Sequence, residues 1–410
     1  MNDIVESYIK LALRTGQYDP DYIDSYHGPE EFRPAALSSV EEKTFPFEEL
    51  VGQVQDLARR LSEITSRDWD RVEKLRHVSM TKQLESLMTE IKLIFGAQMS
   101  FDEESQALYD VVAPAYDVEQ FGEMINNLDK ILPGSGDILT RFNKLKEHVS
   151  IPTNRLEKVF DRVFDECRRR TQRYISLPEG ENFTIEYVKD APWAAYNWYK
   201  GNGFSLIQIN TDFPTRIHEP LHLAAHEGYP GHHLFHSLLE KNLGRERGWM
   251  EFCIAPLFCP AAIIAEGTAE YGVDLVFPKD ERIEFELSQL FPIAGLDARL
   301  AEVFYQALEC LKGIRGLGIE VSRGYLDEKI DREQAIEMLV RYGLRTRERA
   351  EQNLKFADRY GSYVVTYSLG KDLIREYIET RSGREESPGR KWELFYELIS
   401  TPQVPSGLRP

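Results

Sequence analysis

One short segment concentrates the side chains best suited to metal chemistry. Leu221 to Glu240 reads LHLAAHEGYPGHHLFHSLLE and holds five histidines and two glutamates, whereas the whole chain of 410 residues has only nine histidines. Histidine is the commonest metal ligand in proteins and the side chain most easily tuned for proton transfer near neutral pH. The segment therefore predicts a functional site, and a metal centre before any other kind.

The dipeptide His226–Glu227 matches the opening of the zinc-hydrolase motif H-E-x-x-H. In that motif two histidines one helical turn apart bind a single zinc ion, and the glutamate reaches a water molecule beside it. Here a proline occupies the second histidine position, and on a straight helix His233 would lie about 10 Å away. We therefore expect a bulge at Pro230–Gly231 that returns His232 to the ligand position, with His233 as the second choice.

A third ligand is expected from the downstream segment AEGTAEYGVDL, in which Glu266, Glu270 and Asp274 recur at helical spacing. Two histidines and one glutamate leave the fourth position of zinc open, as a catalytic site requires. We predict a Zn²⁺ site formed by His226, His232 and Glu266. Glu270 or Asp274 would contact a ligating histidine without binding the metal, and so fix the orientation of its ring.

Other roles for these histidines remain open. His222 and His226 also form an ordinary i, i+4 pair, although no glutamate follows His222 in the hydrolase position. The simplest expectation for His218, His236 and His77 is that they are solvated or capping residues. The cluster as a whole could also be the polar face of a helix.

Composition narrows the class of protein. The net charge of -18 argues against binding to nucleic acid, which needs clustered Lys and Arg. No apolar run reaches the length of a membrane span, and the start MNDIVESYIKLALRTG lacks the features of a signal peptide, so we expect a cytoplasmic protein with no membrane partner. We expect four reduced cysteines, with only a weak case for a metal ligand among Cys253 and Cys259.

Periodicity predicts a mostly α fold with a small β-sheet just before the histidine segment. Residues 1–173 alternate apolar and charged residues at helical spacing, which predicts an N-terminal helical region. A catalytic region follows at 174–410, and the two regions could also form one continuous domain. FTIEYV and FSLIQIN read as strands, separated by an aromatic-rich loop, DAPWAAYNWYKGNG. Helices are expected from about Glu219 onward, with breaks near Pro260 and Pro278.

Several motifs together resemble the bacterial family known as domain of unknown function 885. They are AAHEGYPGHH, EGTAEYG and SYVVTYSLG, with YHGP, FDEES, LPGSGD, DAPWAAYNWY and INTDFP elsewhere, so the resemblance covers nearly the whole chain. That family is similar to the thermolysin-type zinc peptidases, and its helical body is similar to carboxypeptidase Taq and the oligopeptidases. The resemblance implies a large, multi-helix, metallopeptidase-like body with the sheet next to the active-site helix.

The resemblance also implies roles for individual residues. His226 and His232 match metal ligands of the family, Glu227 its general base, and Glu266 its third ligand. Tyr367, in SYVVTYSLG, is the expected donor to the oxyanion by analogy with related peptidases. Where the family usually has Trp after the Glu-Gly of the downstream motif, this chain has Thr268, and we expect this departure to affect the pocket.

The expected function is zinc-dependent cleavage of peptide bonds in short peptides, of carboxypeptidase or oligopeptidase type. Tyr196 is a second, weaker oxyanion donor, and the strand FSLIQIN is expected to offer its edge to an extended peptide. A solvated face is expected from Arg345, Arg347 and Arg349. One of these arginines could bind a substrate carboxylate. One alternative is an inactive peptidase-like scaffold that binds peptides. A second, with less support, is a di-iron helical oxidase, but such oxidases use paired Glu-x-x-His motifs, and these are not evident in the sequence.

Overall fold

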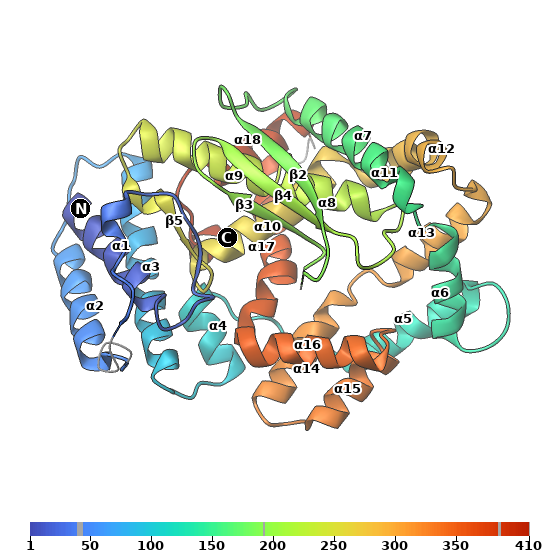
Figure 1. Cartoon of the computed structure of the whole chain (residues 1–410), viewed down its shortest axis with the longest axis horizontal. Coiled ribbons are helices and arrows are strands. Elements are labelled where there is room, and N and C mark those ends of the chain that lie inside the picture. The colour runs from blue at the N-terminus through green and yellow to red at the C-terminus, as the bar shows by residue number, and fades with distance from the viewer. Residues whose placement is uncertain (39–43, 192, 384–386, 410) are drawn as a thin grey trace.

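The first half of the chain is helical, as the periodicity predicts. The computed structural model describes residues 1–38, 44–191, 193–383 and 387–409 (Figure 1). The N-terminal helices are α1 (Asn2–Thr15), α2 (Phe47–Ser62), α3 (Arg71–Ile94), α4 (Phe101–Tyr109), α5 (Val118–Ile131), α6 (Ile138–His148) and α7 (Thr153–Thr171). Ser100 and Asp70 cap α4 and α3 with side-chain hydrogen bonds, which fixes where these helices begin.

Helices also dominate the second half. They are α8 (Glu219–Glu227), α9 (His232–Leu239), α10 (Pro260–Val276), α11 (Lys279–Phe285), α12 (Phe291–Ala294), α13 (Ala301–Cys310), α14 (Arg315–Leu326), α15 (Arg332–Arg341), α16 (Arg347–Tyr360), α17 (Val365–Ser382), α18 (Pro388–Ser400) and α19 (Pro405–Leu408). The predicted breaks at Pro260 and Pro278 are confirmed, because α10 starts at the first and ends before the second. No helix in the described ranges combines the length and apolarity needed to cross a membrane.

A three-stranded sheet precedes the histidine segment. Its strands are β2 (Asn182–Val188), β3 (Ala195–Tyr199) and β4 (Phe204–Asn210), in the order β2, β4, β3. β4 pairs in parallel with β2 and antiparallel with β3, so the expectation that FSLIQIN forms an edge is wrong. The edge beside α8 and α9 is β3, which the sequence had placed in a loop (Figure 1).

One face of the central strand β4 is buried. Ser205, Ile207 and Ile209 are buried on one face, whereas the residues between them are partly exposed. On the same sheet, Phe183 of β2 packs against Phe164 of α7. The sheet is thus covered by the end of the N-terminal helical region.

The main hydrophobic core joins the two predicted regions. It takes buried side chains from Ile4 in α1 to Leu408 in α19, and a second, smaller cluster lies among α5, α14, α15 and α16. The core therefore crosses residue 173, and the division at that residue stays a prediction. A two-stranded pair, β1 (Ile23–Tyr26) with β5 (Ile254–Pro256), also links the N-terminus to the second half.

Two glycines bring α10 and α17 into backbone contact. A Cβ placed on Gly267 would lie 2.5 Å from the carbonyl oxygen of Gly370, so neither helix could approach as closely with a larger residue. This contact sets Glu266 on α10 and Tyr367 on α17 around the same cavity. The glycines of EGTAEYG and SYVVTYSLG therefore have a packing role.

Candidate metal and catalytic site

The chain breaks its helix between Glu227 and His232. The sequence predicted a bulge within one helix; instead α8 ends at Glu227 and α9 begins at His232, with the chain leaving helical geometry between them. The backbone N–H of Gly231 donates to the carbonyl oxygen of Ala225 at 2.9 Å. A Cβ on Gly231 would lie 1.8 Å from the carbonyl oxygen of His226, so this turn requires glycine.

The turn brings three candidate ligands together. His226 Nε2 lies 3.1 Å from His232 Nε2, and the carboxylate of Glu266 lies 3.4 Å from His226 Nε2 and 3.6 Å from His232 Nε2. Tetrahedral zinc with bonds of about 2.0–2.1 Å holds neighbouring donor atoms about 3.3 Å apart. Glu266 Oε2 is buried and accepts no hydrogen bond. The spacing, the donor types and this unpartnered oxygen all fit a zinc ion.

His233 has a different role from that of His232. Its side chain is 0% exposed, and its Nδ1 and Nε2 lie 2.8 Å from Ser205 Oγ and 2.7 Å from Glu181 Oε2. Both ring nitrogens therefore already have partners. His233 ties α9 to the sheet and is not close to the candidate ligands.

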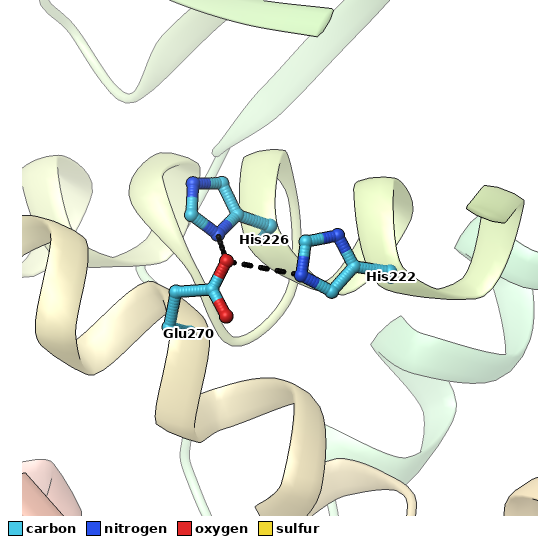
Figure 2. Close-up of side chains that lie close together, drawn as sticks. All are labelled: His222, His226 and Glu270. Carbon is cyan, nitrogen blue, oxygen red and sulfur yellow. Dashed lines mark hydrogen bonds and ion pairs between the residues drawn. The ribbon is translucent and has the colours of Figure 1, made fainter. Parts of the chain in front are cut away.

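A second histidine–glutamate group lies directly behind the first. Glu270 Oε1 is 3.0 Å from His222 Nε2 and 3.6 Å from His226 Nδ1, and Figure 2 shows this carboxylate oxygen facing both rings. Arg315 Nη1 binds the other oxygen of Glu270 at 2.5 Å. A carboxylate on Nδ1 directs Nε2 of a histidine toward a metal, as the sequence suggested for Glu270. Asp274 is not part of this group, because it pairs with lysine and arginine side chains of α17.

The group around His222 also has donor atoms within 4.8 Å of one another, as a metal site would. Its carboxylate differs from that of Glu266 in having both oxygens bound. Glu270 has a histidine on one oxygen and Arg315 on the other, which neutralises its charge. We therefore interpret His222 and Glu270 as supports for His226.

Charges around His226 favour a cation. Burial alone would lower the pKa of His226, but the carboxylates of Glu266, Glu227 and Glu270 raise it to about 9. Burial lowers the pKa of His232 to about 4. The pocket thus holds more negative than positive charge where the three candidate ligands converge, which is the electrostatic condition for binding a divalent ion.

Glu227 is placed to act as a base. It is 6% exposed, lines the cavity and follows the candidate ligand His226. Burial, followed by the charges of Glu266 and Glu270, raises the pKa of its carboxyl to about 7. A base with that pKa can accept and return a proton near neutral pH. The amide of Asn197 on β3 donates to the Glu227 carbonyl oxygen at 2.7 Å and fixes the end of α8.

Two tyrosines were predicted as oxyanion donors, and they differ in their partners. Tyr367 is 37% exposed and lines the cavity, and burial, with the charges of Glu266 and Glu227, keeps its pKa well above the usual range. Its hydroxyl is therefore protonated and available to donate. Tyr196 on β3 also lines the cavity, but its hydroxyl donates to Asp24.

The candidate site opens into a cavity of about 690 Å³. Its walls come from α1, β1, α3, β3, α8, α9, α10 and α17, so both predicted regions contribute. Small-ligand pockets span about 300–1,000 Å³. Thr268, which replaces the usual Trp, is 1% exposed, donates to the carbonyl oxygen of Ile264 and does not line the cavity, so any effect of this departure on the pocket is indirect.

Other residues singled out in the sequence have structural environments. His218 stands at the N-cap position of α8, but its side chain makes no capping hydrogen bond and its ring packs against Phe304. His236 is not solvated or capping as predicted, because its ring packs against Tyr199 and burial lowers its pKa to about 3. His77 does cap a helix: its Nε2 lies 3.1 Å from a carbonyl oxygen in the last turn of α2. Each histidine thus contributes to packing or to a helix end.

The cysteines are free thiols, as predicted. Cys259 lines the cavity, but its thiol donates to the carbonyl oxygen of Pro256 and burial raises its pKa to about 11. Within the described ranges, neither Cys259 nor Cys253 belongs to a group able to hold a metal.

Some residues of the site carried no sequence signal. Asp24 reaches the cavity only because β1 pairs with β5, and Arg315 meets Glu270 only through the fold. Asn197 lies in the aromatic segment DAPWAAYNWY, which the sequence predicted to be a loop. These contacts join residues far apart in the chain, so motif spacing could not reveal them.

Comparison with known proteins identifies a fold but no family. No family model matches the sequence, and no curated protein does. A presumed lipoprotein from Colwellia psychrerythraea aligns with a TM-score of 0.57 and 14% identity, over 88% of this chain and 65% of that chain.

Two further structures align less closely. A presumed lipoprotein of unknown function from Shewanella oneidensis matches with a TM-score of 0.49 and 13% identity, over 88% of this chain and 71% of that one. The crystal structure of a protein designated BsuCP matches with a TM-score of 0.49 and 12% identity, over 98% and 89% of the two chains. This protein therefore shares the fold of the Colwellia psychrerythraea protein, of which it spans about 65% of the length.

Proposed function

We propose that this protein is a zinc-dependent hydrolase of short peptides, related to the family of domain of unknown function 885. The observation that carries the proposal is the donor set of His226, His232 and Glu266, with contacts of 3.1–3.6 Å, directly beside Glu227 in one cavity. Three protein ligands with a neighbouring carboxylate are the arrangement of a catalytic zinc site.

Three residues would hold the ion and two would support them. His226 and His232 offer Nε2, and Glu266 offers its carboxylate. Glu270 lies 3.6 Å from His226 Nδ1 and is held by His222, so the two would support His226 from the Nδ1 side and leave its Nε2 as the ligand. Zinc, when bound, supplies a Lewis acid that polarises a carbonyl and makes a water molecule more acidic.

Glu227 and Tyr367 would carry out the proton and charge transfers. Glu227 takes the proton of the attacking water and delivers it to the leaving amine, which its raised pKa allows in both directions. Tyr367 keeps its phenolic proton and donates a hydrogen bond to the carbonyl oxygen as negative charge develops there.

The substrate class follows from the shape of the cavity. The edge strand β3 lines it and can pair with an extended peptide, while walls from many elements enclose the space. Such a cavity favours short peptides over folded proteins. The acidic composition argues against a nucleic-acid partner, and the proposal keeps the cytoplasmic location without a membrane partner that the sequence analysis expects.

The test is the substitution Glu227→Gln in zinc-loaded protein. We expect the variant to retain zinc and to lose about 10²–10⁴-fold in turnover of a peptide that the wild type cleaves, because general-base catalysis typically contributes that much. Turnover and zinc content should be measured on the same preparations. Unchanged turnover would refute the role of Glu227, and a wild type that binds zinc and peptides but cleaves none would indicate a binding scaffold.

A further inference from the structure

The charges of the cavity wall are one-sided. Six acidic residues line it, whereas none of the described lining residues is lysine or arginine. The acidic residues are Asp21, Asp24, Glu227, Glu251, Glu266 and Glu270. The three arginines expected on a solvated face, Arg345, Arg347 and Arg349, are exposed and do not line the cavity.

Most of these acidic side chains already have a positively charged or histidine partner. Asp21 pairs with Arg359, Glu251 with Arg76 and Glu270 with Arg315. Glu266 faces His226 and His232. Only Asp24 and Glu227 face the cavity without an ion pair among the described residues, and Glu227 already has a role as the base.

Asp24 is held in a fixed position. It lies in β1, which β5 pins through backbone pairing, and one of its oxygens accepts the hydroxyl proton of Tyr196 from the edge strand β3. Burial and then the charge of Glu266 raise the pKa of Asp24 to about 7. A buried carboxylate without a cation is costly, and a cationic group in the cavity would remove that cost.

We propose that Asp24 binds a primary ammonium group of the peptide substrate. The inference rests on the proposed function and deepens it by naming the substrate class. Asp24 and the candidate metal ligands line the same cavity, so an ammonium group at Asp24 and the scissile bond near those ligands would occupy it together. The group is either the free N-terminus or a lysine side chain.

The same charges disfavour the carboxypeptidase type that the sequence suggested. A substrate held by its C-terminal carboxylate needs an arginine or lysine in the cavity. Of the described residues that line this cavity, none supplies such a group, and the two acidic side chains without an ion pair, Asp24 and Glu227, do not favour a carboxylate. Recognition of a free amine is the electrostatically matched alternative.

The test compares short alanine-based peptides with free ends, an acetylated N-terminus, an amidated C-terminus, or an acetylated N-terminus with an internal lysine. Cleavage and binding, by calorimetry, are measured with wild type, Asp24→Asn and Asp21→Asn, all zinc-loaded. Removing the ammonium group should lower kcat/KM about tenfold to a hundredfold in wild type, because a charge-assisted hydrogen bond is lost. Asp24→Asn should abolish this discrimination, and the ion-paired Asp21→Asn should preserve it.

The outcomes separate the inference from the proposed function. Loss of cleavage on acetylation that an internal lysine does not rescue identifies the N-terminus as the ammonium group, and rescue by that lysine identifies a lysine side chain. Equal cleavage of free and acetylated peptides, or loss of cleavage on C-terminal amidation, would overturn the inference while leaving the hydrolase intact. If no peptide is cleaved, the hydrolase fails, and the calorimetric comparison alone decides whether Asp24 binds an amine. Because the wild-type comparison needs no substitution, a folding defect of Asp24→Asn, detected by thermal melting, does not obscure the result.

Discussion

Two groups of histidine and glutamate meet at His226 and use its two nitrogens differently. On the Nε2 side, His232 and Glu266 converge, and Glu266 Oε2 is buried without a hydrogen bond. On the Nδ1 side, Glu270 is bound by His222 and Arg315 as well. The residue types are nearly the same on both sides, but both oxygens of Glu270 are bound, whereas Glu266 keeps one oxygen without a hydrogen bond.

The difference teaches that residue type does not separate a ligand from a support. What separates them is whether both oxygens of the carboxylate have a partner and whether a nearby cation already neutralises it. Arg315 provides that cation for Glu270, and the described residues provide none for Glu266 other than the two histidines. We therefore assign zinc binding to the residues on the Nε2 side of His226, and the positioning of the His226 ring to those on its Nδ1 side.

The largest expected effect comes from removing a ligand on the Nε2 side. His232→Ala should abolish stoichiometric zinc binding, because it takes away one of three protein donors. The matched control is His233→Ala, which should keep zinc but lower the free energy of unfolding by roughly 1–3 kcal/mol, because buried Glu181 loses one hydrogen-bond partner and keeps Arg168 and Tyr229. Elemental analysis and chemical denaturation measure the two effects. Zinc retained in His232→Ala and lost in folded His233→Ala would reverse the assignment.

A smaller effect is expected on the Nδ1 side. Glu270→Gln should weaken zinc affinity about 10–100-fold, the usual cost of losing a carboxylate that orients a ligating histidine. Saturating zinc should restore full occupancy, which a titration against a competing chelator can measure. If Glu270→Gln lost zinc entirely while His232→Ala kept it, the metal would belong to the group of His222, His226 and Glu270.

The smallest effect is expected from Arg315. Its side chain is about half exposed, so its pair with Glu270 is screened by solvent. Arg315→Gln removes a positive charge near the bound cation and should raise zinc affinity by less than about fivefold in the same titration. A tenfold loss would show that Arg315 is needed to hold Glu270 in place.

Much of the fold followed from local patterns. Helical periodicity located α2 and α3, the prolines at 260 and 278 marked the ends of α10, and β-branched residues marked β2 and β4. The strand β3 was missed, because its aromatic residues lie between Pro192 and the glycines Gly201 and Gly203, which favour loops. Its pairing with β4 outweighed that local signal.

The candidate site was predictable only where its residues carry a motif. The spacing of His226, Glu227 and Glu266 suggested a shared site, and the turn at Gly231 made His232 a plausible partner. Asp24 could not be found in this way, because a long-range strand pairing delivers it to the cavity. The role of His233 also depended on tertiary contacts, with Glu181 and Ser205.

The most direct test of the central claim is the metal content of purified, untagged protein, compared between wild type and His226→Ala. Elemental analysis should find about one zinc ion per chain in the wild type and none in the variant, whose folding is checked by circular dichroism. A wild type without zinc or another transition metal, even after zinc is supplied, would contradict the account, as would equal zinc in both proteins.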